Sequence, residues 1–381
     1  MRCDSKMERV VFYVDPMSYN NLSIYDCSLL KNIKGYDIYY YGSIHYDRDK
    51  LPGINYRLIF RYNRISHFLF KTWSYVVSIL KLFLEVLRRK PSVVHIQWIR
   101  LWGIDYLFLL FLRWRGIAVV YTAHNVLPHD SGERYKSRYK KYYSRVSRII
   151  VHSANSKSEL VRELDVREDK ITVIPHGVLD MNVSDMDLQK RKGQFIRDYA
   201  LENKTVFTVL GIHSYYKGSD MIVRFWSENP LVRENSEVIL FMWGKSTGID
   251  LIPLEQLKNA SVRNEYISSE DYLAVLQLSD VVLLPYRNIS QSGVLMSVIN
   301  ESVPFVVSAV GGLSDPLALA DLGWCIGTPS YENFEKTMVY LLQNNGELRR
   351  KKNSADWSML KEYYSWARIG EKTKSLYDSL N

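Results

Sequence analysis

Short apolar runs alternate with longer amphipathic segments along nearly the whole chain. The runs are rich in Val, Ile, Leu and Phe and lack alternation of apolar and polar residues, which is typical of strands buried on both faces. We expect strands at 10–14, 37–41, 93–97, 118–122, 148–152 and 172–174, followed by 206–210, 238–243, 262–266, 281–285 and 305–308. Strands that alternate with helices in this way predict parallel sheets joined by right-handed crossovers.

The pattern breaks once, in a polar stretch at residues 178–203 that has no predicted strand. A chain of 381 residues is long for one hydrophobic core, because single cores stop growing near about 250–300 residues. The sequence therefore predicts an α/β protein with two Rossmann-like, doubly wound domains at 1–180 and 181–360. Ligands bind beyond the carboxyl ends of such strands, so two facing sheets would share one cleft. The tail, 361–381, is expected to form a helix that packs back on the first domain.

Charge divides the chain near the same place. Residues 1–180 carry 29 Lys and Arg against 17 Asp and Glu, whereas the remainder carries 21 against 24. A basic domain favours an anionic partner such as acidic lipid, a phosphate-bearing acceptor or nucleic acid. Nothing in the sequence resembles a nucleic-acid-binding fold, so nucleic acid is not an expected partner.

Three segments of the basic half predict contact with an anionic membrane. Residues 134–148 combine seven Lys and Arg with four Tyr and no acid, 66–90 form a long helical pattern that ends in three basic residues, and 101–115 form an aromatic-rich helix. Basic, aromatic, amphipathic surfaces bind acidic lipid. The alternatives are that 66–90 packs on its own sheet and that 134–148 is a solvated face.

The expected compartment is the cytoplasm. The first residues are charged where an export signal would be apolar, and three scattered cysteines form neither a metal spacing nor a disulfide pattern. Together with the basic surface, this predicts a peripheral protein on the inner face of the plasma membrane.

Two loops of the second half are candidates for anion binding. The segment GIHSYYKGSD, 211–220, follows a strand and opens a helix, so backbone N–H groups and the Lys217 side chain could meet at one place. The segment 290–293 leads into the apolar helix VLMSVIN and offers a second cradle of N–H groups. The alternatives are a surface turn with a solvated lysine and an ordinary connecting loop.

Histidines mark the first half. His124 follows a predicted strand and could hydrogen bond a sugar hydroxyl or move a proton. His129 lies five residues further on, a weak metal spacing without a completing carboxylate pair, and a core or cap role is the alternative. His176 belongs to a Pro-His-Gly turn and could be purely structural. No metal site or other cofactor is expected.

The order of several motifs resembles glycosyltransferase family 4 and its GT-B relatives. IVHSANSKSEL is followed by VIPHGV, by a loop with Lys-Gly, by a small-residue loop with Ser-Gly, and by VPFVVSAVGGL. The resemblance is strongest from about residue 145 to 330. It implies the GT-B fold, with a donor-binding second domain, an acceptor-binding first domain and a nucleotide-diphosphate sugar as a partner.

The resemblance also assigns residues. Lys217 matches the lysine that holds the donor diphosphate, 291–294 match a loop that holds phosphates and sugar, and His124 matches a histidine near the donor sugar. The resemblance also matches positions beside the nucleotide base, and we add our own candidates for acid–base chemistry. The expected catalytic residues are His124, Lys217 and Asp15. The expected donor-binding residues are Gly211, His213, Lys217, Gly244, Tyr266, Ile267, Ser290, Gln291, Ser292, Gly293 and Val294.

The chain departs from the family pattern in the same loops. Family members carry two glutamates eight positions apart, whereas Ser290 and Ser297 stand near those positions here and Glu301 fits neither. His213 replaces a common arginine, and DPMSYNN at 15–21 replaces paired glycines. These differences indicate a divergent branch.

Charge explains how such a site would work. Departure of the donor diphosphate develops negative charge, which N–H groups and Lys217 can stabilise without a metal. In an inverting reaction His124 or Asp15 would take the acceptor proton, and in a retaining reaction the donor phosphate could take it. The expected function is transfer of a sugar to a lipid-linked or saccharide acceptor for cell-surface polysaccharide or glycolipid. The alternatives are a nucleotide-sugar 2-epimerase and a catalytically silent nucleotide-sugar-binding partner.

Overall fold

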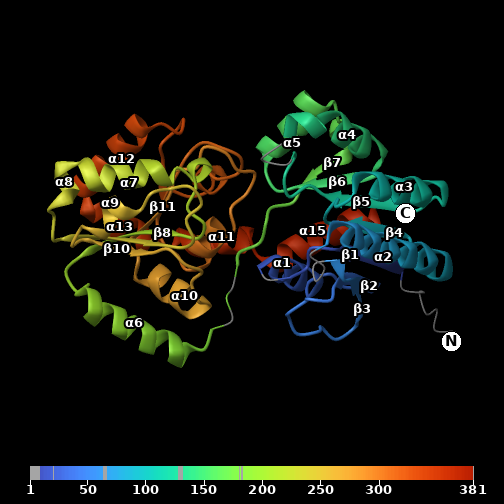
Figure 1. Ribbon diagram of the computed structural model, residues 1–381, viewed down its shortest axis with the longest axis horizontal. Coiled ribbons are helices and arrows are strands. Elements are labelled where there is room, and N and C mark those ends of the chain that lie inside the picture. Colours follow the sequence, from blue (N-terminus) through green and yellow to red (C-terminus); the bar gives the residue numbers. More distant parts are fainter. Residues whose placement is uncertain are drawn as a thin grey trace. The chain divides into compact units, whose positions relative to one another are not determined.

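A computed structural model describes residues 9–19, 21–62, 67–127, 132–179, 181 and 183–380. The chain divides into two compact units (Figure 1). Unit 1 comprises residues 1–177 and 365–381, and unit 2 comprises residues 178–364. The sequence placed these boundaries at 180 and 360.

Unit 1 contains a seven-stranded parallel sheet in the order β3-β2-β1-β4-β5-β6-β7. Its strands are β1 (Arg9–Asp15), β2 (Tyr36–Ser43), β3 (Ile54–Phe60), β4 (Val93–Ile96), β5 (Ala118–Thr122), β6 (Arg148–Val151) and β7 (Ile171–Val173). Its helices are α1 (Asn21–Leu30), α2 (Phe68–Arg89), α3 (Trp102–Trp114), α4 (Gly132–Arg145), α5 (Ala154–Leu164) and α15 (Trp366–Asp378), with a 3-10 turn at Glu168–Lys170.

Unit 2 contains a six-stranded parallel sheet in the order β10-β9-β8-β11-β12-β13. Its strands are β8 (Thr205–Leu210), β9 (Val238–Trp243), β10 (Ala260–Arg263), β11 (Val281–Leu284), β12 (Phe305–Val307) and β13 (Gly323–Cys325). Its helices are α6 (Asp185–Tyr199), α7 (Ser219–Glu228), α8 (Pro230–Arg233), α9 (Ile252–Glu255), α10 (Ser269–Leu278), α11 (Gly293–Asn300), α12 (Tyr331–Gln343), α13 (Asn345–Lys352) and α14 (Asp356–Tyr363). Short 3-10 turns lie at Tyr215–Lys217 and Asp315–Ala318.

Each sheet is buried on both faces because successive side chains of a strand point to opposite sides. In β1, Phe12 and Val14 enter one apolar cluster while Val11 and Tyr13 enter the other. All six residues of β9 are buried in the same manner. The two-unit, doubly wound α/β prediction is therefore confirmed.

The eleven expected strands are all present, and two further strands were missed. The first, β3, is an edge strand whose residues are mostly half-buried, so polar and apolar residues mix in INYRLIF. The second, β13, has only three residues, also at an edge. The polar stretch at 178–203 contains α6, whose buried residues are Leu188 and Phe195.

The last helix completes unit 1. Ile369, Leu376 and Tyr377 of α15 join one of the two apolar clusters of that unit. Tyr36 donates a hydrogen bond to Asp378 over 2.6 Å, which fixes the end of the helix beside β2. Among the described residues, no helix has a stretch long and apolar enough to cross a membrane.

Candidate functional site

Both sheets reverse their strand order at one point, between β1 and β4 in unit 1 and between β8 and β11 in unit 2. Ligands of open α/β sheets bind beyond the carboxyl ends of the strands at this point. The loops that leave β8 and β11 contain most of the residues expected to bind the donor. The two units are described in turn.

Two glycines shape the loops after β8 and β9. Gly211 has φ +92° and Gly244 has φ +146°, conformations that residues with a side chain rarely adopt. A Cβ atom at Gly244 would overlap the backbone carbonyl of Gly211. The two loops are therefore in direct backbone contact, and this contact requires glycine at position 244.

Lys217 points at the Gly211 turn. It closes the 3-10 turn Tyr215–Lys217, and its Nζ lies 3.8 Å from the position that a Cβ of Gly211 would take. The ammonium also lies 5.5 Å from the centre of the Tyr286 ring. Burial lowers the pKa of Lys217 to about 8. No ion pair of Lys217 is present among the described residues, so its charge is held half-buried beside a glycine turn without an acidic side chain to balance it.

Arg287 fixes the turn that carries Lys217. Its guanidinium donates to both carboxylate oxygens of Asp220, over 2.6 and 2.8 Å, and to the carbonyl of Tyr215 over 2.6 Å. Its backbone N–H donates to the carbonyl of Tyr216 over 2.7 Å. Bidentate pairs of this kind are geometrically specific, so the lysine turn is held against the loop that follows β11.

Several buried polar atoms near this turn have no hydrogen-bond partner in the part of the chain that the structure describes. They are both ring nitrogens of His213, Oγ of Ser214 and Oε1 of Gln291. Burial, with a smaller contribution from the charge of Lys217, lowers the pKa of His213 to about 4, so its ring is neutral. An unsatisfied buried polar group costs about 1–3 kcal/mol. A bound ligand that supplies the missing hydrogen bonds would explain why these groups are unsatisfied.

The loop after β11 provides a helix start. Ser292 caps α11 by accepting a hydrogen bond from the N–H of Leu295, and Gly293 is exposed at the first position of the helix. The side chain of Val294 lies 3.7 Å from the position of a Gly211 Cβ. The start of α11 and the glycine turn after β8 are therefore neighbours. Free N–H groups at a helix start attract anions.

The remaining donor candidates have different surroundings. Ser290 accepts a hydrogen bond from the N–H of Gly312 through its carbonyl. Tyr266 is 81% exposed, and Ile267 packs against the core of unit 2. Ser297 is buried and donates to the carbonyl of Gly293 within its own helix, so its hydroxyl serves α11.

In unit 1, His124 belongs to a chain of hydrogen-bonded side chains at the ends of β4, β5 and β6. Its ring stacks on Trp98 at 4.6 Å, and its Nδ1 lies 3.2 Å from Nε2 of His152. His152 contacts the carbonyl of Ile174 through Nδ1 over 2.9 Å. The amide of Gln97 lies 2.9 Å from Nε2 of His124. Sequence reasoning found His124 but not these partners, which come from separate strands.

Two acceptors determine the tautomers of these histidines. A carbonyl only accepts, so neutral His152 carries its proton on Nδ1 and donates it to Ile174. The atom of Gln97 beside Nε2 of His124 is the amide oxygen, which also only accepts, so neutral His124 donates from Nε2. The unprotonated Nδ1 of His124 lies 3.2 Å from Nε2 of His152. A substrate hydroxyl at His124 would have to replace one of these neighbours.

Four histidines of unit 1 are neutral. Burial lowers the pKa of His95 and of His152 to about 3 and that of His176 to about 4. Burial, followed by the neighbouring histidines, lowers the pKa of His124 well below its ordinary value. A base of such low pKa takes a proton poorly near neutral pH, so proton abstraction is a weak role for His124. His129 lies outside the described residues.

Asp15 is buried beside a second carboxyl group that the sequence did not indicate. Asp26 accepts hydrogen bonds from the hydroxyls of Tyr13 and Tyr40 over 2.8 and 2.7 Å. Burial and the neighbouring Asp26 raise the pKa of Asp15 well above its usual range. Asp15 also accepts from the N–H of Met17 over 2.6 Å, which shapes the turn after β1. These contacts favour a structural role for Asp15.

Unit 1 should lose stability as the pH falls from about 7 to 5. Its four buried histidines are neutral in the folded state and protonated below pH ~6.5 in the unfolded chain, so unfolding takes up protons. Each contributes up to about 1.4 kcal/mol per pH unit, and the raised pKa values of Asp15 and Asp26 offset part of this.

Urea unfolding at several pH values tests the histidine effect. The urea concentration at the midpoint of unfolding should fall as the pH is lowered. In His95→Gln the dependence of this midpoint on pH should be smaller by the contribution of one histidine. A midpoint that stays constant between pH 7 and 5 would contradict the neutral histidine chain.

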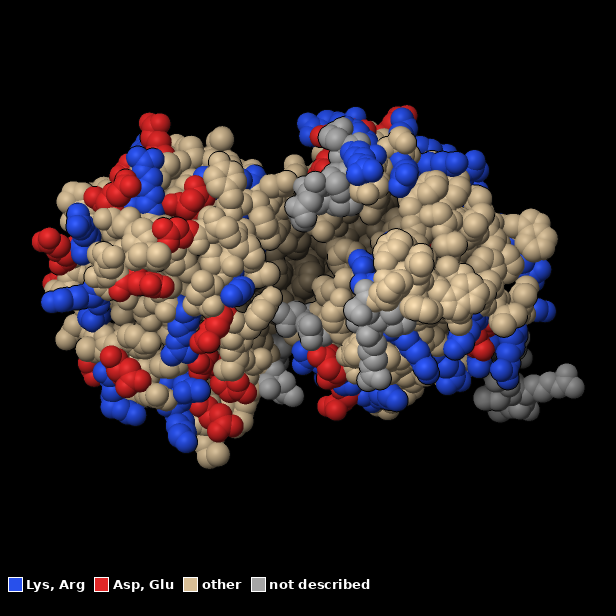
Figure 2. Space-filling model, viewed as in Figure 1, with Lys and Arg blue, Asp and Glu red and all other residues tan. Residues whose placement is uncertain are grey.

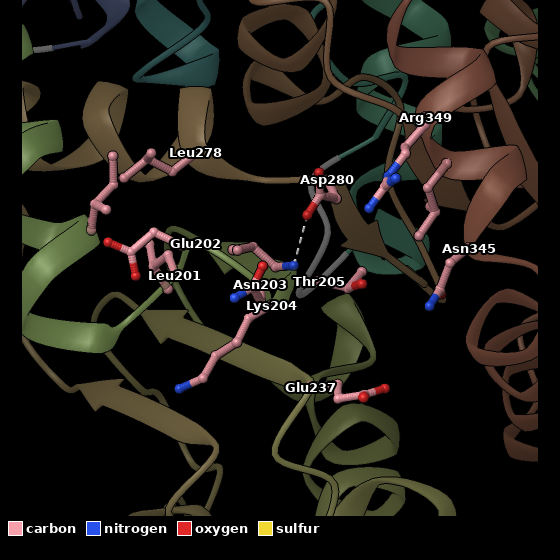
Figure 3. A pocket seen from close by; sticks show the side chains of 13 residues that line it. Leu201, Glu202, Asn203, Lys204, Thr205, Glu237, Leu278, Asp280, Asn345 and Arg349 are labelled. Atoms are coloured by element: carbon pink, nitrogen blue, oxygen red, sulfur yellow. Dashed lines mark hydrogen bonds between the residues drawn. The ribbon is translucent and has the colours of Figure 1, made fainter.

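A hollow of about 560 Å³ lies elsewhere on unit 2 (Figure 3). Thr205, Glu237 and Asp280 of its lining stand at or just before the first residues of β8, β9 and β11. Because these strands are parallel, the hollow lies at the amino edge of the sheet, opposite the loops that carry Gly211 and Lys217. None of the expected site residues lines it, and Asp280 already accepts from the N–H of Val206.

Comparisons with known proteins bear on the family and the fold. Residues 33–179 match the model of Glycosyltransferase Family 4, which overlaps the stretch suggested by the motifs at 145–179. A curated relative, D-inositol 3-phosphate glycosyltransferase of Corynebacterium aurimucosum, is 22% identical over 239 residues. That alignment covers 60% of this chain and 56% of the relative, so it spans little more than half the relative's length.

Solved structures share the fold over the whole chain. Sucrose-phosphate synthase from Thermosynechococcus elongatus has a TM-score of 0.74 at 12% identity and covers 98% of this chain and 99% of its own. Anabaena HepE in complex with UDP has a TM-score of 0.71 at 11% identity and covers 97% and 100%. At such low identity these likenesses establish the fold.

Proposed function

We propose that this chain, a GT-B-fold protein with a glycosyltransferase family 4 region at residues 33–179, transfers a sugar from a nucleoside-diphosphate sugar to an acceptor hydroxyl. In this proposal unit 2 binds the donor and unit 1 binds the acceptor. The observation that carries it is the half-buried ammonium of Lys217, which lies beside the Gly211 turn and pairs with no acidic side chain among the described residues.

A diphosphate fits the chemistry of this turn. Its negative charge would pair with Lys217, and the N–H groups at the start of α11 would add hydrogen bonds. His213, Ser214 and Gln291 have the unsatisfied polar atoms that phosphate or sugar oxygens could meet. Because these groups already supply positive charge and donors, we propose that transfer needs no metal ion. UDP, which is bound in the Anabaena structure, is the first nucleotide to test.

The route of the acceptor proton follows from unit 1. His124 has a lowered pKa, donates from Nε2 to Gln97 and has its Nδ1 beside His152, and Asp15 is buried with a raised pKa. Neither is a good base, which favours transfer of the proton to the departing phosphate. This is the retaining route. The acceptor we propose is a lipid-linked or saccharide hydroxyl used in cell-surface polysaccharide or glycolipid synthesis, supported by the basic character of residues 1–180.

One observation favours a second candidate, a nucleotide-sugar-binding protein without turnover. Ser290 and Ser297 stand near the positions where family members carry glutamates, and the Ser297 hydroxyl bonds within its own helix. Such a protein would bind the nucleotide normally yet transfer no sugar to any acceptor. A nucleotide-sugar 2-epimerase would instead convert the donor without an acceptor, so product analysis in the absence of acceptor distinguishes the three.

A nucleoside diphosphate of the correct base should raise the melting temperature of the chain. A ligand at 100 times its Kd stabilises the folded state by about 2.7 kcal/mol, which corresponds to a shift of roughly 5–10 °C for a unit of this size. A thermal-shift screen of UDP, GDP, ADP and their sugars measures this. Lys204→Ala, at the opposite edge of the same sheet, removes the same charge and should keep the shift. If no nucleotide stabilises the protein, the donor assignment to unit 2 fails.

A further inference from the structure

Two helices of unit 1 expose an unusual number of large apolar side chains. On α2 these are Phe68, Leu69, Phe70, Trp73, Leu80, Leu84 and Leu87, and on α3 they are Leu107, Leu110 and Trp114. The two helices contact each other. Figure 2 shows a broad uncharged area on this unit, with Lys and Arg gathered around it. We call these ten residues the α2–α3 face.

The α2–α3 face is not the side of the helices that packs on the sheet. In α2 the buried residues include Tyr75, Ile79, Leu82 and Val86, which are three or four positions apart and line one side. The exposed residues at 73, 80, 84 and 87 repeat with the same period on the other side. Helix α2 is therefore apolar on two sides, and only one of these sides packs into the core of unit 1.

The charges of these helices are of one sign at the surface. Lys81 and Arg88 are exposed in α2, and Arg113 and Arg115 are exposed at the end of α3. The acidic residues of α2 and α3 are Glu85 and Asp105. Glu85 pairs with Arg89 at 2.7 Å, and Asp105 is buried where it accepts from the Tyr75 hydroxyl. The α2–α3 face is thus bordered by positive charges that form no ion pair with the residues the structure describes.

The neighbouring helix α4 extends this basic border. Arg138 and Lys141 of α4 lie over the ring of Trp102, at 5.7 and 6.0 Å, so α4 adjoins the start of α3. Helix α4 also carries Arg134 and Arg145, together with Lys136 and Lys140, which pair with Glu163 and Asp165 at 3.4 Å. Aromatic rings beside basic side chains are typical of surfaces that lie at the boundary between lipid headgroups and acyl chains.

We propose that the α2–α3 face docks on an anionic lipid bilayer. The Leu, Phe and Trp side chains would enter the headgroup boundary, and Lys81, Arg88 and the basic residues of α4 would meet lipid phosphates. A second copy of the chain is a poorer occupant, because two basic borders would then face each other. A large exposed apolar patch ordinarily marks an interaction site, and here the charge selects an anionic one.

Docking at this place suits the chemistry proposed above but does not depend on it. Helices that follow parallel strands begin at the carboxyl edge of the sheet, which is the edge where His124 and Trp98 lie. Phe68, Leu69 and Phe70 stand at the first turn of α2 and therefore at that edge. A sugar acceptor carried by a membrane lipid would be presented at the same edge.

Vesicle flotation of the full chain without nucleotide tests the proposal. Wild-type protein should float with vesicles of phosphatidylcholine and phosphatidylglycerol at low salt, and it should float less with phosphatidylcholine alone. Leu80→Glu with Leu84→Glu should weaken binding at least about tenfold. Lys81→Glu with Arg88→Glu should weaken it about 25-fold and make it less dependent on salt, because the basic residues of α4 remain. Met186→Glu with Ile252→Glu, at exposed apolar positions of unit 2, is the matched control and should bind as wild type.

The outcomes separate the possible occupants. Equal flotation of wild type and the Leu80→Glu, Leu84→Glu variant overturns the proposal. So does a wild-type dimer in lipid-free sedimentation that the same variant converts to monomer, since that result assigns the face to a second copy. Melting temperatures of the variants should match wild type because the changed side chains are exposed. Nucleotide binding is measured separately, so its failure would remove the donor site and leave the vesicle result standing.

Discussion

Replacing Lys217 with alanine should reduce sugar transfer by about 100- to 1,000-fold while unit 2 stays folded, because loss of one preorganised donor to a developing oxyanion costs about 3–4 kcal/mol. The Lys217 ammonium is the cation placed at the Gly211 turn, and its burial already holds its pKa near 8. Removing a half-buried charge that lacks an ion pair leaves no buried counter-charge behind, so stability should change little.

Three measurements check this prediction. Initial rates with saturating acceptor give kcat and KM, and the melting temperature monitors folding. Lys204→Ala is the control for the loss of a lysine from unit 2 and should retain activity. Lys217→Ala with wild-type rates would remove the diphosphate from this turn.

The same side chain predicts how donor binding depends on pH. Lys217 is protonated below pH ~8 and loses its proton above it, so affinity for a diphosphate should be highest at lower pH and fall as the pH rises through 8. Isothermal titration of the wild type and of Lys217→Arg compares a titrating cation with one that stays charged. The arginine variant should show no such fall.

A methyl group at position 244 should also abolish donor binding. In Gly244→Ala the new Cβ would overlap the carbonyl of Gly211, and φ at +146° is strained for any residue with a side chain. Either the loop after β8 moves or the backbone of β9 shifts, and both displace the Gly211 turn from Lys217. We expect a loss of at least about 2 kcal/mol in stability and no thermal shift with nucleotide.

Gly248→Ala separates the effect of backbone strain from that of the overlap with the Gly211 carbonyl. Gly248 lies in the same loop with φ +80°, and a Cβ there meets nothing within 4 Å. That variant should cost only about 1–2 kcal/mol of backbone strain and should keep nucleotide binding. Equal effects of the two substitutions on binding would show that contact between the Gly211 and Gly244 loops is unimportant for the donor site.

The sequence predicted what depends on local pattern. Long apolar runs gave the central strands because burial on both faces excludes polar residues, and the doubly wound order followed from alternation with helices. The edge strands lack such a long apolar run and were therefore not predicted. In β3 one face is partly solvated, so Arg57 is exposed within the strand, and β13 is too short to show a period.

The sequence predicted those site residues that lie within one loop. It did not predict contacts between residues that are far apart in the sequence. Lys217 and Gly211 belong to one segment, and their proximity follows from its length. The hydrogen bond from Arg287 to Asp220 joins residues 67 positions apart, and no sequence pattern in either loop predicts it. The Asp15 and Asp26 pair likewise arises because a helix returns across the end of β1. Surroundings of this kind determine pKa values, which is why Asp15 was taken for a base.

The place of α15 affects how the chain can fold during synthesis. Residues 365–380 close one face of the unit 1 sheet, where Gly370 packs against Asn32 and Tyr377 lies 2.5 Å from Nδ1 of His95. A ribosome makes that helix after all of unit 2. Unit 2 is continuous in sequence and can mature while α15 is still emerging. The nascent unit 1 must meanwhile keep an apolar sheet face uncovered until α15 has left the ribosome.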